Sequence, residues 1–140
     1  MSTARFESQI KQIPHPQQAV YNMLSNLENI GKIQDRVPQD RVRDMTFDRD
    51  SVSVRVEPIG QLRLRVCERQ EPKCVKFVTE QSPVPFTVWI QMLPVTASSC
   101  KMRVTAEADL NPLIKAMVEK QLQTSVDEIA NGLAAIDYEQ

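Results

Sequence analysis

The stretch Asn111–Tyr138, NPLIKAMVEKQLQTSVDEIANGLAAIDY, decides the fold of this chain. Asn111 can accept hydrogen bonds from the first free amides of a helix, and Pro112 suits the first helical position because no N–H is needed there. No proline follows, so the pattern predicts one uninterrupted helix over residues 112–137. At 100° per residue, its apolar residues gather on one broad face: Ile114, Met117, Val118, Leu122, Ile129, Leu133 and Ile136. Such a helix is about 39 Å long, which is enough to cross a whole sheet.

The first third of the chain predicts a strand and two short helices. Residues 5–13 alternate between apolar and charged positions, as in a half-buried strand, and Pro14-His15-Pro16 ends it. Apolar residues then recur at helical spacing over residues 19–27, and a second short helical piece follows through Ile30 and Ile33. Residues 31–44 are charged and contain a proline, which predicts a loop leading into the sheet.

Six alternating runs follow between residues 45 and 110, separated by short turns rich in Asp, Pro and Gly. Links of this length join antiparallel neighbours, because a parallel crossover needs about a dozen residues or more. The inward rows expected on the longer runs are Val52, Val54 and Val56; Leu62, Leu64 and Val66; Val75, Phe77 and Thr79; Phe86, Val88, Ile90 and Met92; and Met102, Val104, Ala106 and Ala108. With no repeat or linker in sight, residues 1–140 are predicted to form a single α+β domain.

Composition limits the function. The 140 residues are 41% hydrophobic and 25% charged, as is usual for a globular protein, and the net charge is −1. Acids and bases are interleaved, which argues against nucleic-acid binding through bulk charge. No run reaches signal-peptide or membrane-spanning character, so we expect a cytoplasmic protein without stable membrane insertion. The three cysteines and one histidine lack zinc-site spacing, and neither a metal nor another cofactor is predicted.

The order of elements resembles the helix-grip fold of the START-related superfamily (SRPBCC), which includes birch-pollen-allergen-like proteins, START domains and polyketide cyclases. The likeness covers essentially the whole chain and is strongest to small bacterial members. It rests on the paired short helices after the first strand and on the long terminal helix that begins Asn111-Pro112-Leu113-Ile114. The resemblance implies a seven-stranded antiparallel sheet wrapped around the C-terminal helix, with an apolar cavity between them.

The implied cavity predicts binding of a small hydrophobic or amphipathic ligand that is lipid-like or polyketide-like. Apolar burial would supply the affinity, and a few hydroxyl and amide groups would orient the ligand. The candidate ligand-binding residues are Ser8, Met23, Thr79, Val88, Ile90, Met92, Met102, Val104, Met117, Val118, Gln121 and Ser125. For Ser8, Thr79, Gln121 and Ser125 the alternative is an ordinary hydrogen bond to nearby backbone, which is the commoner role of buried polar groups.

A cyclase-like or dehydratase-like enzyme is the first alternative. The assignable acids and bases on the strands have outward parity, so no catalytic residue is predicted and the pattern favours binding over catalysis. An enzyme would require a loop acid such as Asp35, Asp40 or Asp44 to point into the cavity. His15 lacks an orienting partner in the sequence and is interpreted as part of a turn.

A protein-interaction module with a filled core is the second alternative. Trp89 and Leu93 have outward parity, so they either form a partner surface, such as a homodimer contact, or are covered by other side chains. Cys67 and Cys74 flank one turn with the same parity, which predicts that they face each other across a hairpin as free thiols.

Overall fold

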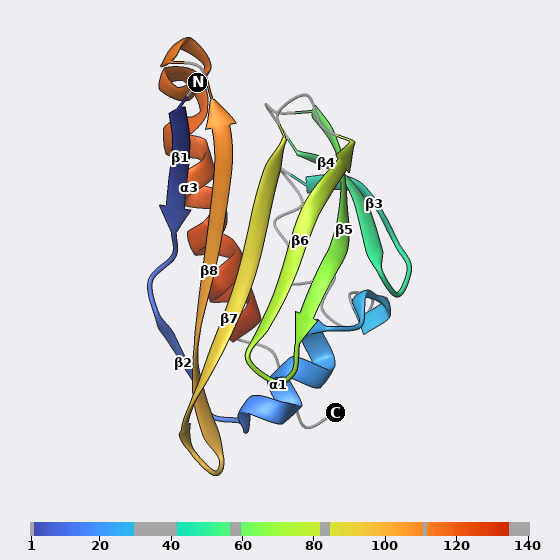
Figure 1. The fold of residues 1–140 in the computed structure, drawn as a ribbon, viewed down its shortest axis with the longest axis vertical. Helices are drawn as coiled ribbons and strands as arrows, with labels where there is room; N and C mark the ends of the chain where they lie inside the picture. The colour runs from blue at the N-terminus through green and yellow to red at the C-terminus, as the bar shows by residue number, and fades with distance from the viewer. Residues whose placement is uncertain (1, 30–41, 57–59, 82–84, 111, 135–140) are drawn as a thin grey trace.

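A computed structural model of the chain describes residues 2–29, 42–56, 60–81, 85–110 and 112–134 (Figure 1). Within these residues, one sheet of eight antiparallel strands curves beside a long helix, and a short helix closes one end. The elements are β1 (Ser2–Glu7), β2 (Lys11–Ile13), α1 (Gln17–Leu24), the 3-10 turn η1 (Leu27–Asn29), β3 (Val42–Phe47), β4 (Ser51–Val56), β5 (Gly60–Gln70), β6 (Cys74–Gln81), β7 (Phe86–Thr96), β8 (Ser99–Leu110) and α3 (Pro112–Ala134).

The strand order is β1-β8-β7-β6-β5-β4-β3, and β2 also pairs with β8. β1 and β2 therefore share one position in the sheet, so the predicted seven-stranded antiparallel sheet with a terminal helix is confirmed. The predicted first strand is interrupted at Ser8, whose hydroxyl accepts a hydrogen bond from the Val104 N–H at 2.9 Å. Because the interruption ends the alternation, Ile10 is 60% exposed instead of sharing the inner side with Phe6.

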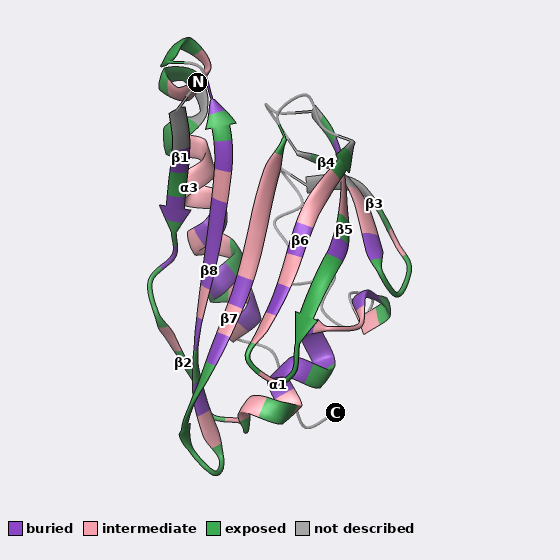
Figure 2. Cartoon of the chain, in the orientation of Figure 1, coloured by how far each residue is buried: buried purple, intermediate pink, exposed green. Residues whose placement is uncertain are grey.

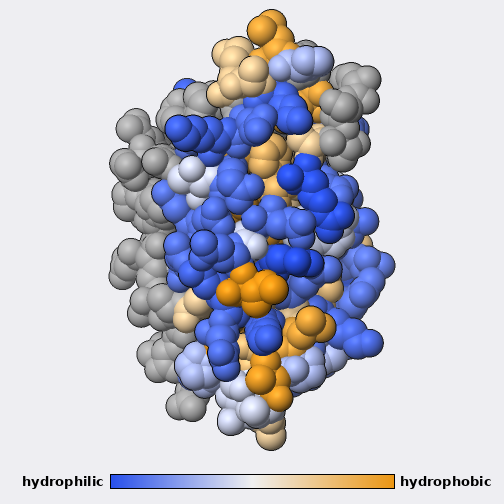
Figure 3. All heavy atoms as spheres, turned by 90° about the vertical axis from the view of Figure 1, so that its left-hand side faces the viewer, coloured by the Kyte–Doolittle hydropathy of each residue, from blue (hydrophilic) through white to orange (hydrophobic). Residues whose placement is uncertain are grey.

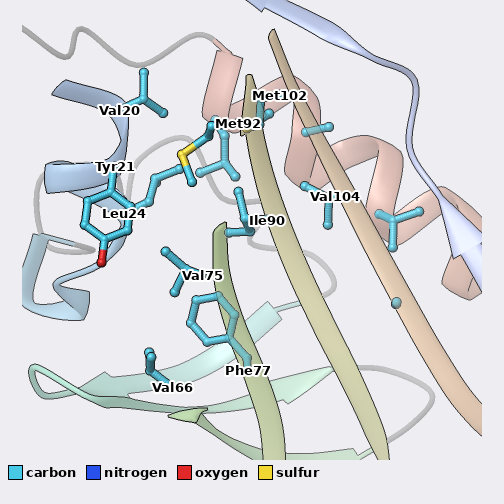
Figure 4. Close-up of a cluster of buried hydrophobic side chains, with 14 of the residues drawn as sticks. Val20, Tyr21, Leu24, Val66, Val75, Phe77, Ile90, Met92, Met102 and Val104 are labelled. Carbon is cyan, nitrogen blue, oxygen red and sulfur yellow. The ribbon is translucent and has the colours of Figure 1, made fainter. Parts of the chain in front are cut away.

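The inner face of the sheet carries the apolar rows that the alternation predicts. Across β7 and β8, Val88 is opposite Ala106, Ile90 opposite Val104, and Met92 opposite Met102. These rows join the core between the sheet, α1 and α3. Figure 4 shows Val20, Tyr21 and Leu24 of α1 beside this face.

The outer face of the sheet carries ion pairs and one tryptophan. Arg5 pairs with Glu107 at 3.2 Å, and Arg103 pairs with Glu7 at 3.1 Å. Trp89 lies on this face and is half-buried, with the Lys76 ammonium 5.5 Å from its ring centroid. A neighbouring side chain therefore covers part of the tryptophan, although Leu93 on the same strand is 63% exposed.

Helix α3 has 23 residues and packs through its C-terminal half. Val126, Ala130 and Leu133 form a buried row at helical spacing. The apolar face predicted from the sequence is rotated relative to this row, since Met117 is 75% exposed and Ile129 is 46% exposed. Ala130, with its small side chain, is 0% exposed at the centre of the buried row. Ile136 lies outside the described residues, as does the side chain of Val118.

Helix α1 and η1 close one end of the interior and are held there by β5. The Arg69 Nε donates a hydrogen bond to the Ser25 carbonyl oxygen at 2.9 Å, just after α1. Its Nη2 contacts the Asp50 carboxylate at 2.7 Å, in the turn between β3 and β4. No helix among the described residues is both long enough and apolar enough to cross a membrane.

Candidate functional site

Along β7, the inner side chains change from fully buried to half-buried toward Phe86. On β7, Met92 has no exposed surface and Ile90 is 7% exposed, whereas Val88 and Phe86 are half-buried. Figure 2 shows β7 as intermediate in its first part, with buried segments farther along and an exposed final part. The inner face of β7 is therefore incompletely covered toward Phe86, whereas Ala106, Ala108 and Leu110 of the neighbouring β8 are buried.

The incompletely covered residues form a continuous row across the sheet. Val52 of β4 is opposite Leu64 of β5, and Leu64 is opposite Thr79 of β6. Thr79 is joined to Phe86 of β7 by a hydrogen bond from the Phe86 N–H to the threonine Oγ1 at 3.3 Å. We call Val52, Leu64, Thr79, Phe86 and Val88 the half-buried patch.

Helix α3 contributes partly buried side chains to the same core. Ile114 and Leu122, both half-buried, pack against the core cluster. Gln121 lies next to Leu122 in the sequence and is half-buried, and none of the hydrogen bonds found among the described residues involves its side-chain amide. The Gln121 amide is therefore a half-buried hydrogen-bonding group on α3.

The other three polar candidates form backbone hydrogen bonds, as the alternative interpretation predicted. The Ser8 hydroxyl donates to the Gln9 carbonyl oxygen at 2.9 Å and accepts from Val104. The Ser125 hydroxyl donates to the Gln121 carbonyl oxygen one helical turn earlier, at 2.9 Å. Thr79 accepts from Phe86 and keeps its own O–H available, and it alone of these three belongs to the half-buried patch.

Most apolar candidates are core residues without accessible surface. Met92 and Val104 are 0% exposed and Met102 is 1% exposed, while Met23 and Ile90 are each 7% exposed. These five residues belong to the buried core, and their contact with a ligand in an internal cavity stays a prediction. Met117 does not share the buried face of α3, because its side chain is 75% exposed.

Val88 is the apolar candidate that lies in the patch. Sequence reasoning did not select Val52, Leu64 and Phe86, although it placed all three in the inward rows. Their parity in the sequence does not separate them from the buried members of the same rows, because the difference depends on which elements cover each position.

A groove with a volume of about 710 Å³ lies elsewhere, between edge strand β1 and the N-terminal half of α3. Its lining residues are Ala4, Arg5, Phe6, Lys115, Ala116, Glu119, Lys120 and Gln123. This lining is largely polar and charged, and Figure 3, which faces this edge of the molecule, shows mostly hydrophilic side chains. The groove is distinct from the half-buried patch.

The described residues provide no obvious acid–base machinery at the patch. Burial raises the pKa of the Tyr21 hydroxyl, and the Glu71 carboxylate raises it further, but Tyr21 belongs to the buried cluster at the α1 end. Hydrogen bonds from the Asp50 backbone and the Ser51 hydroxyl lower the pKa of Asp48, which lies in an exposed turn. Among the described residues, no cluster of three or more His, Cys, Asp or Glu residues could hold a metal ion.

The loop acids and the cysteines singled out in the sequence lie outside the patch or outside the residues that the structure describes. Asp35 and Asp40 fall in residues that the structure does not describe, and the same is true of the Asp44 side chain. Cys67 and Cys74 are free thiols but do not face each other, because Gln70 is opposite Cys74, and Cys67 falls in a register shift between Val66 and Glu68. The prediction of a facing pair is therefore wrong.

Comparison with known proteins shows the fold. No protein-family model matches the sequence, and a search of curated proteins finds no match. Among solved structures, norcoclaurine synthase from Thalictrum flavum aligns with a TM-score of 0.74 at 12% identity, over 95% of this chain and 85% of the synthase. The chain has the helix-grip fold, as the resemblance to START-related (SRPBCC) proteins predicted.

Two bacterial structures extend this START-related comparison. A START superfamily protein from Mycobacterium smegmatis aligns with a TM-score of 0.64 at 11% identity, over 94% of each chain. A protein from Thermus thermophilus aligns with a TM-score of 0.65 at 14% identity, also over 94% of each chain. At these identities the likeness describes the START-related fold and not the activity of the chain.

Proposed function

We propose that this START-related protein binds a small hydrophobic or amphipathic molecule between the sheet and α3, against the half-buried patch. The observation that carries the proposal is the row Val52, Leu64, Thr79 and Phe86, which runs unbroken over four strands yet is only partly covered. Covering apolar surface gains about 25 cal/mol per Å², so a ligand that completes this burial is stabilised by the same effect as the core.

The polar groups near the patch favour an amphipathic ligand over a pure hydrocarbon. The Thr79 O–H is available as a donor, because its oxygen already accepts from the Phe86 N–H. The Gln121 amide supplies both donor and acceptor from α3. A ligand with an apolar body and one or two hydroxyl or carbonyl groups would cover the half-buried patch and form hydrogen bonds with these polar groups.

Structures with the same fold support this choice. Norcoclaurine synthase from Thalictrum flavum has been solved in complex with dopamine and hydroxybenzaldehyde, which are small aromatic molecules. That protein is an enzyme, whereas the patch described in this chain carries no carboxylate, imidazole or amine. We therefore propose binding without catalysis. A cytoplasmic location and a homodimer stay predictions.

A bulky substitution at Val88, inside the half-buried patch, tests the proposed binding site. We expect Val88→Trp to occupy the uncovered space and to lower the affinity for the neutral dye Nile red about tenfold or more, a change worth about 1.4 kcal/mol. The matched control is Val78→Trp, since Val78 neighbours Phe77 on β6 but has outward parity and is also half-buried. Fluorescence titration gives the affinities, and urea unfolding verifies that each variant folds.

Two results would reject the patch as the binding site. Equal dye affinity for Val88→Trp and the unsubstituted protein would show that binding occurs elsewhere. Loss of several kcal/mol of unfolding free energy in Val88→Trp would show that no space is available there. Mass spectrometry of the native protein from its source would then identify any bound molecule.

A further inference from the structure

Strand β1 is an edge of the sheet, and its outer side faces the groove beside α3. β1 pairs with β8 on one side and has no strand on the other among the described residues. Edge strands present backbone N–H and C=O groups that can pair with a further strand. The hydrogen bonds of Ser8 and Glu7 show which residues of β1 direct their backbone N–H and C=O groups away from β8.

The alternation of an antiparallel pair assigns the backbone groups of β1. The Ser8 N–H donates to the Val104 carbonyl oxygen at 2.8 Å, so the backbone of Ser8 points toward β8. Because successive residues alternate, Phe6 and Ala4 also point toward β8, while Glu7, Arg5 and Thr3 point away from it. Arg5 and Glu107 are therefore a non-hydrogen-bonded pair, in agreement with their close side-chain contact.

Contacts with α3 verify this assignment independently. The Gln123 Nε2 donates to the Glu7 carbonyl oxygen at 2.9 Å, and the Gln9 N–H donates to the Asp127 carboxylate at 3.2 Å. Both backbone groups thus face α3 and not β8. Farther along β1, no hydrogen bond among the described residues reaches the outward N–H and C=O groups of Thr3 and Arg5, which leaves that part of the edge open.

The groove beside this open edge has an excess of positive charge. Lys115 and Lys120 line it, and neither forms an ion pair within the described part of the chain. Arg5 also lines the groove, although its side chain is engaged with Glu107 on the outer face. Glu119 is the one acidic residue among the lining residues.

We propose that the groove between β1 and α3 binds an extended acidic peptide segment of another protein by β-strand addition. The backbone of the peptide would pair with the N–H and C=O groups of Thr3 and Arg5 and so extend the sheet. Alternate side chains of the peptide would point toward α3, where its carboxylates would pair with Lys115 and Lys120, and the side chains between them would point to the outer side. A groove of about 710 Å³ has room for such a segment.

A second copy of this chain fits the same edge less well. Symmetric pairing of two β1 strands would bring Lys115 and Lys120 of both copies toward one another, and like charges oppose such contacts. An acidic segment turns the same lysines into a source of affinity. The inference is independent of the proposed ligand, because the groove and the half-buried patch share no residue.

The test uses the acetylated and amidated peptide Val-Glu-Val-Glu-Val-Glu, with its Val-Lys counterpart as the charge control. Amide shifts of the nitrogen-15-labelled protein report binding, and we expect the largest changes at Thr3 and Arg5. We expect the affinity of the lysine peptide to be lower by about tenfold or more. The double variant Lys115→Glu with Lys120→Glu should reverse this preference.

Backbone methylation of the peptide tests strand addition directly. One version of the peptide is N-methylated at its three valines, and a second version at its three glutamates. Each version therefore lacks the backbone N–H donors on one side of the added strand. Only the backbone groups of alternate residues face the neighbouring strand. We therefore expect the affinity of one methylated peptide to fall about tenfold or more and the affinity of the other to stay unchanged.

A protein variant provides the reciprocal test. Proline is tolerated on an edge strand where its missing N–H would point away from the sheet, so Arg5→Pro should fold and lose peptide binding. Arg5→Val is the matched control, because it also removes the ion pair with Glu107 but keeps the N–H. If Arg5→Pro fails to fold, the methylated peptides still decide the question.

Three outcomes would overturn the proposal. The first is the absence of amide shifts at Thr3 and Arg5 up to millimolar peptide. The second is equal affinity for the two methylated peptides. The third is a dimer by sedimentation equilibrium in which the Arg5 amide is already protected from hydrogen exchange. The last result would assign the edge to a second copy of the chain.

Discussion

At the scale of single residues, Ser8 shows how one hydroxyl supports a break in a strand. A regular antiparallel pair would use the Ser8 carbonyl to accept from the Val104 N–H, but the Ser8 hydroxyl takes that place at 2.9 Å. The released backbone bends, and pairing with β8 resumes at Lys11, opposite Met102. Ser8 is therefore a structural residue whose 6% exposed surface has no free polar group to offer a ligand.

We expect Ser8→Ala to lower the free energy of unfolding by about 1–3 kcal/mol, because the buried Val104 N–H loses its acceptor. The matched control is Ser98→Ala in the exposed β7–β8 turn, which should change stability by less than about 0.5 kcal/mol. Urea unfolding monitored by circular dichroism measures both values. Equal stability of the two variants would contradict this role for Ser8.

At the scale of elements, Arg69 connects three segments that are far apart in the sequence. Its guanidinium contacts the Ser25 carbonyl after α1 and the Asp50 carboxylate in the β3–β4 turn. The same turn also accepts a backbone hydrogen bond from Leu27 of η1 through the Arg49 carbonyl at 3.0 Å. Arg69 thereby helps to hold the short helices against the end of the sheet, where they bury the core.

Arg69→Ala should lower the unfolding free energy by about 1–2 kcal/mol, because the hydrogen bonds of the guanidinium to Ser25, Arg49 and Asp50 are lost, although the side chain is 34% exposed. Arg65→Ala is the control, since Arg65 forms one ion pair with Glu80 on the outer face, and its loss should cost less than about 1 kcal/mol. Hydrogen exchange should additionally become faster in α1 of the Arg69 variant only. Unchanged exchange in α1 would argue against the tether.

At the scale of the whole molecule, the two halves of α3 have different surroundings. The C-terminal half packs through Val126, Ala130 and Leu133, whereas Leu113 and Met117 in the N-terminal half are 74% and 75% exposed. The helix is therefore packed asymmetrically, since its C-terminal half is buried against the core and its N-terminal half carries large exposed side chains.

Adding the same side chain at two alanines of α3 tests this asymmetry. Ala130 is 0% exposed, so Ala130→Leu should overpack the contact with the sheet and cost about 1–3 kcal/mol of unfolding free energy. Ala116 is exposed, and Ala116→Leu should be close to neutral because leucine and alanine are both good helix formers. Thermal and urea unfolding compare the two. Similar costs would contradict the packing described for α3.

The sequence by itself determined the elements, their order and their inward rows. Alternation along β7, short links between strands and the proline-started apolar run after Leu110 are local signals, because each depends on the geometry of one element. They were sufficient for an antiparallel sheet with a terminal helix, and the resemblance in element order then indicated the helix-grip fold. They also placed Val88 and Met92 on the same side of the sheet.

Only the tertiary structure decided which of these side chains remain accessible. Val88 and Met92 have the same parity and similar chemistry, yet α1 covers Met92 and leaves Val88 half-buried. The rotation of α3, the register shift at Cys67 and the open backbone of Arg5 likewise depend on contacts between distant segments. Periodicity reports the side on which a residue lies, whereas burial depends on the elements that reach that side, and this difference limits what sequence reasoning could say about the site.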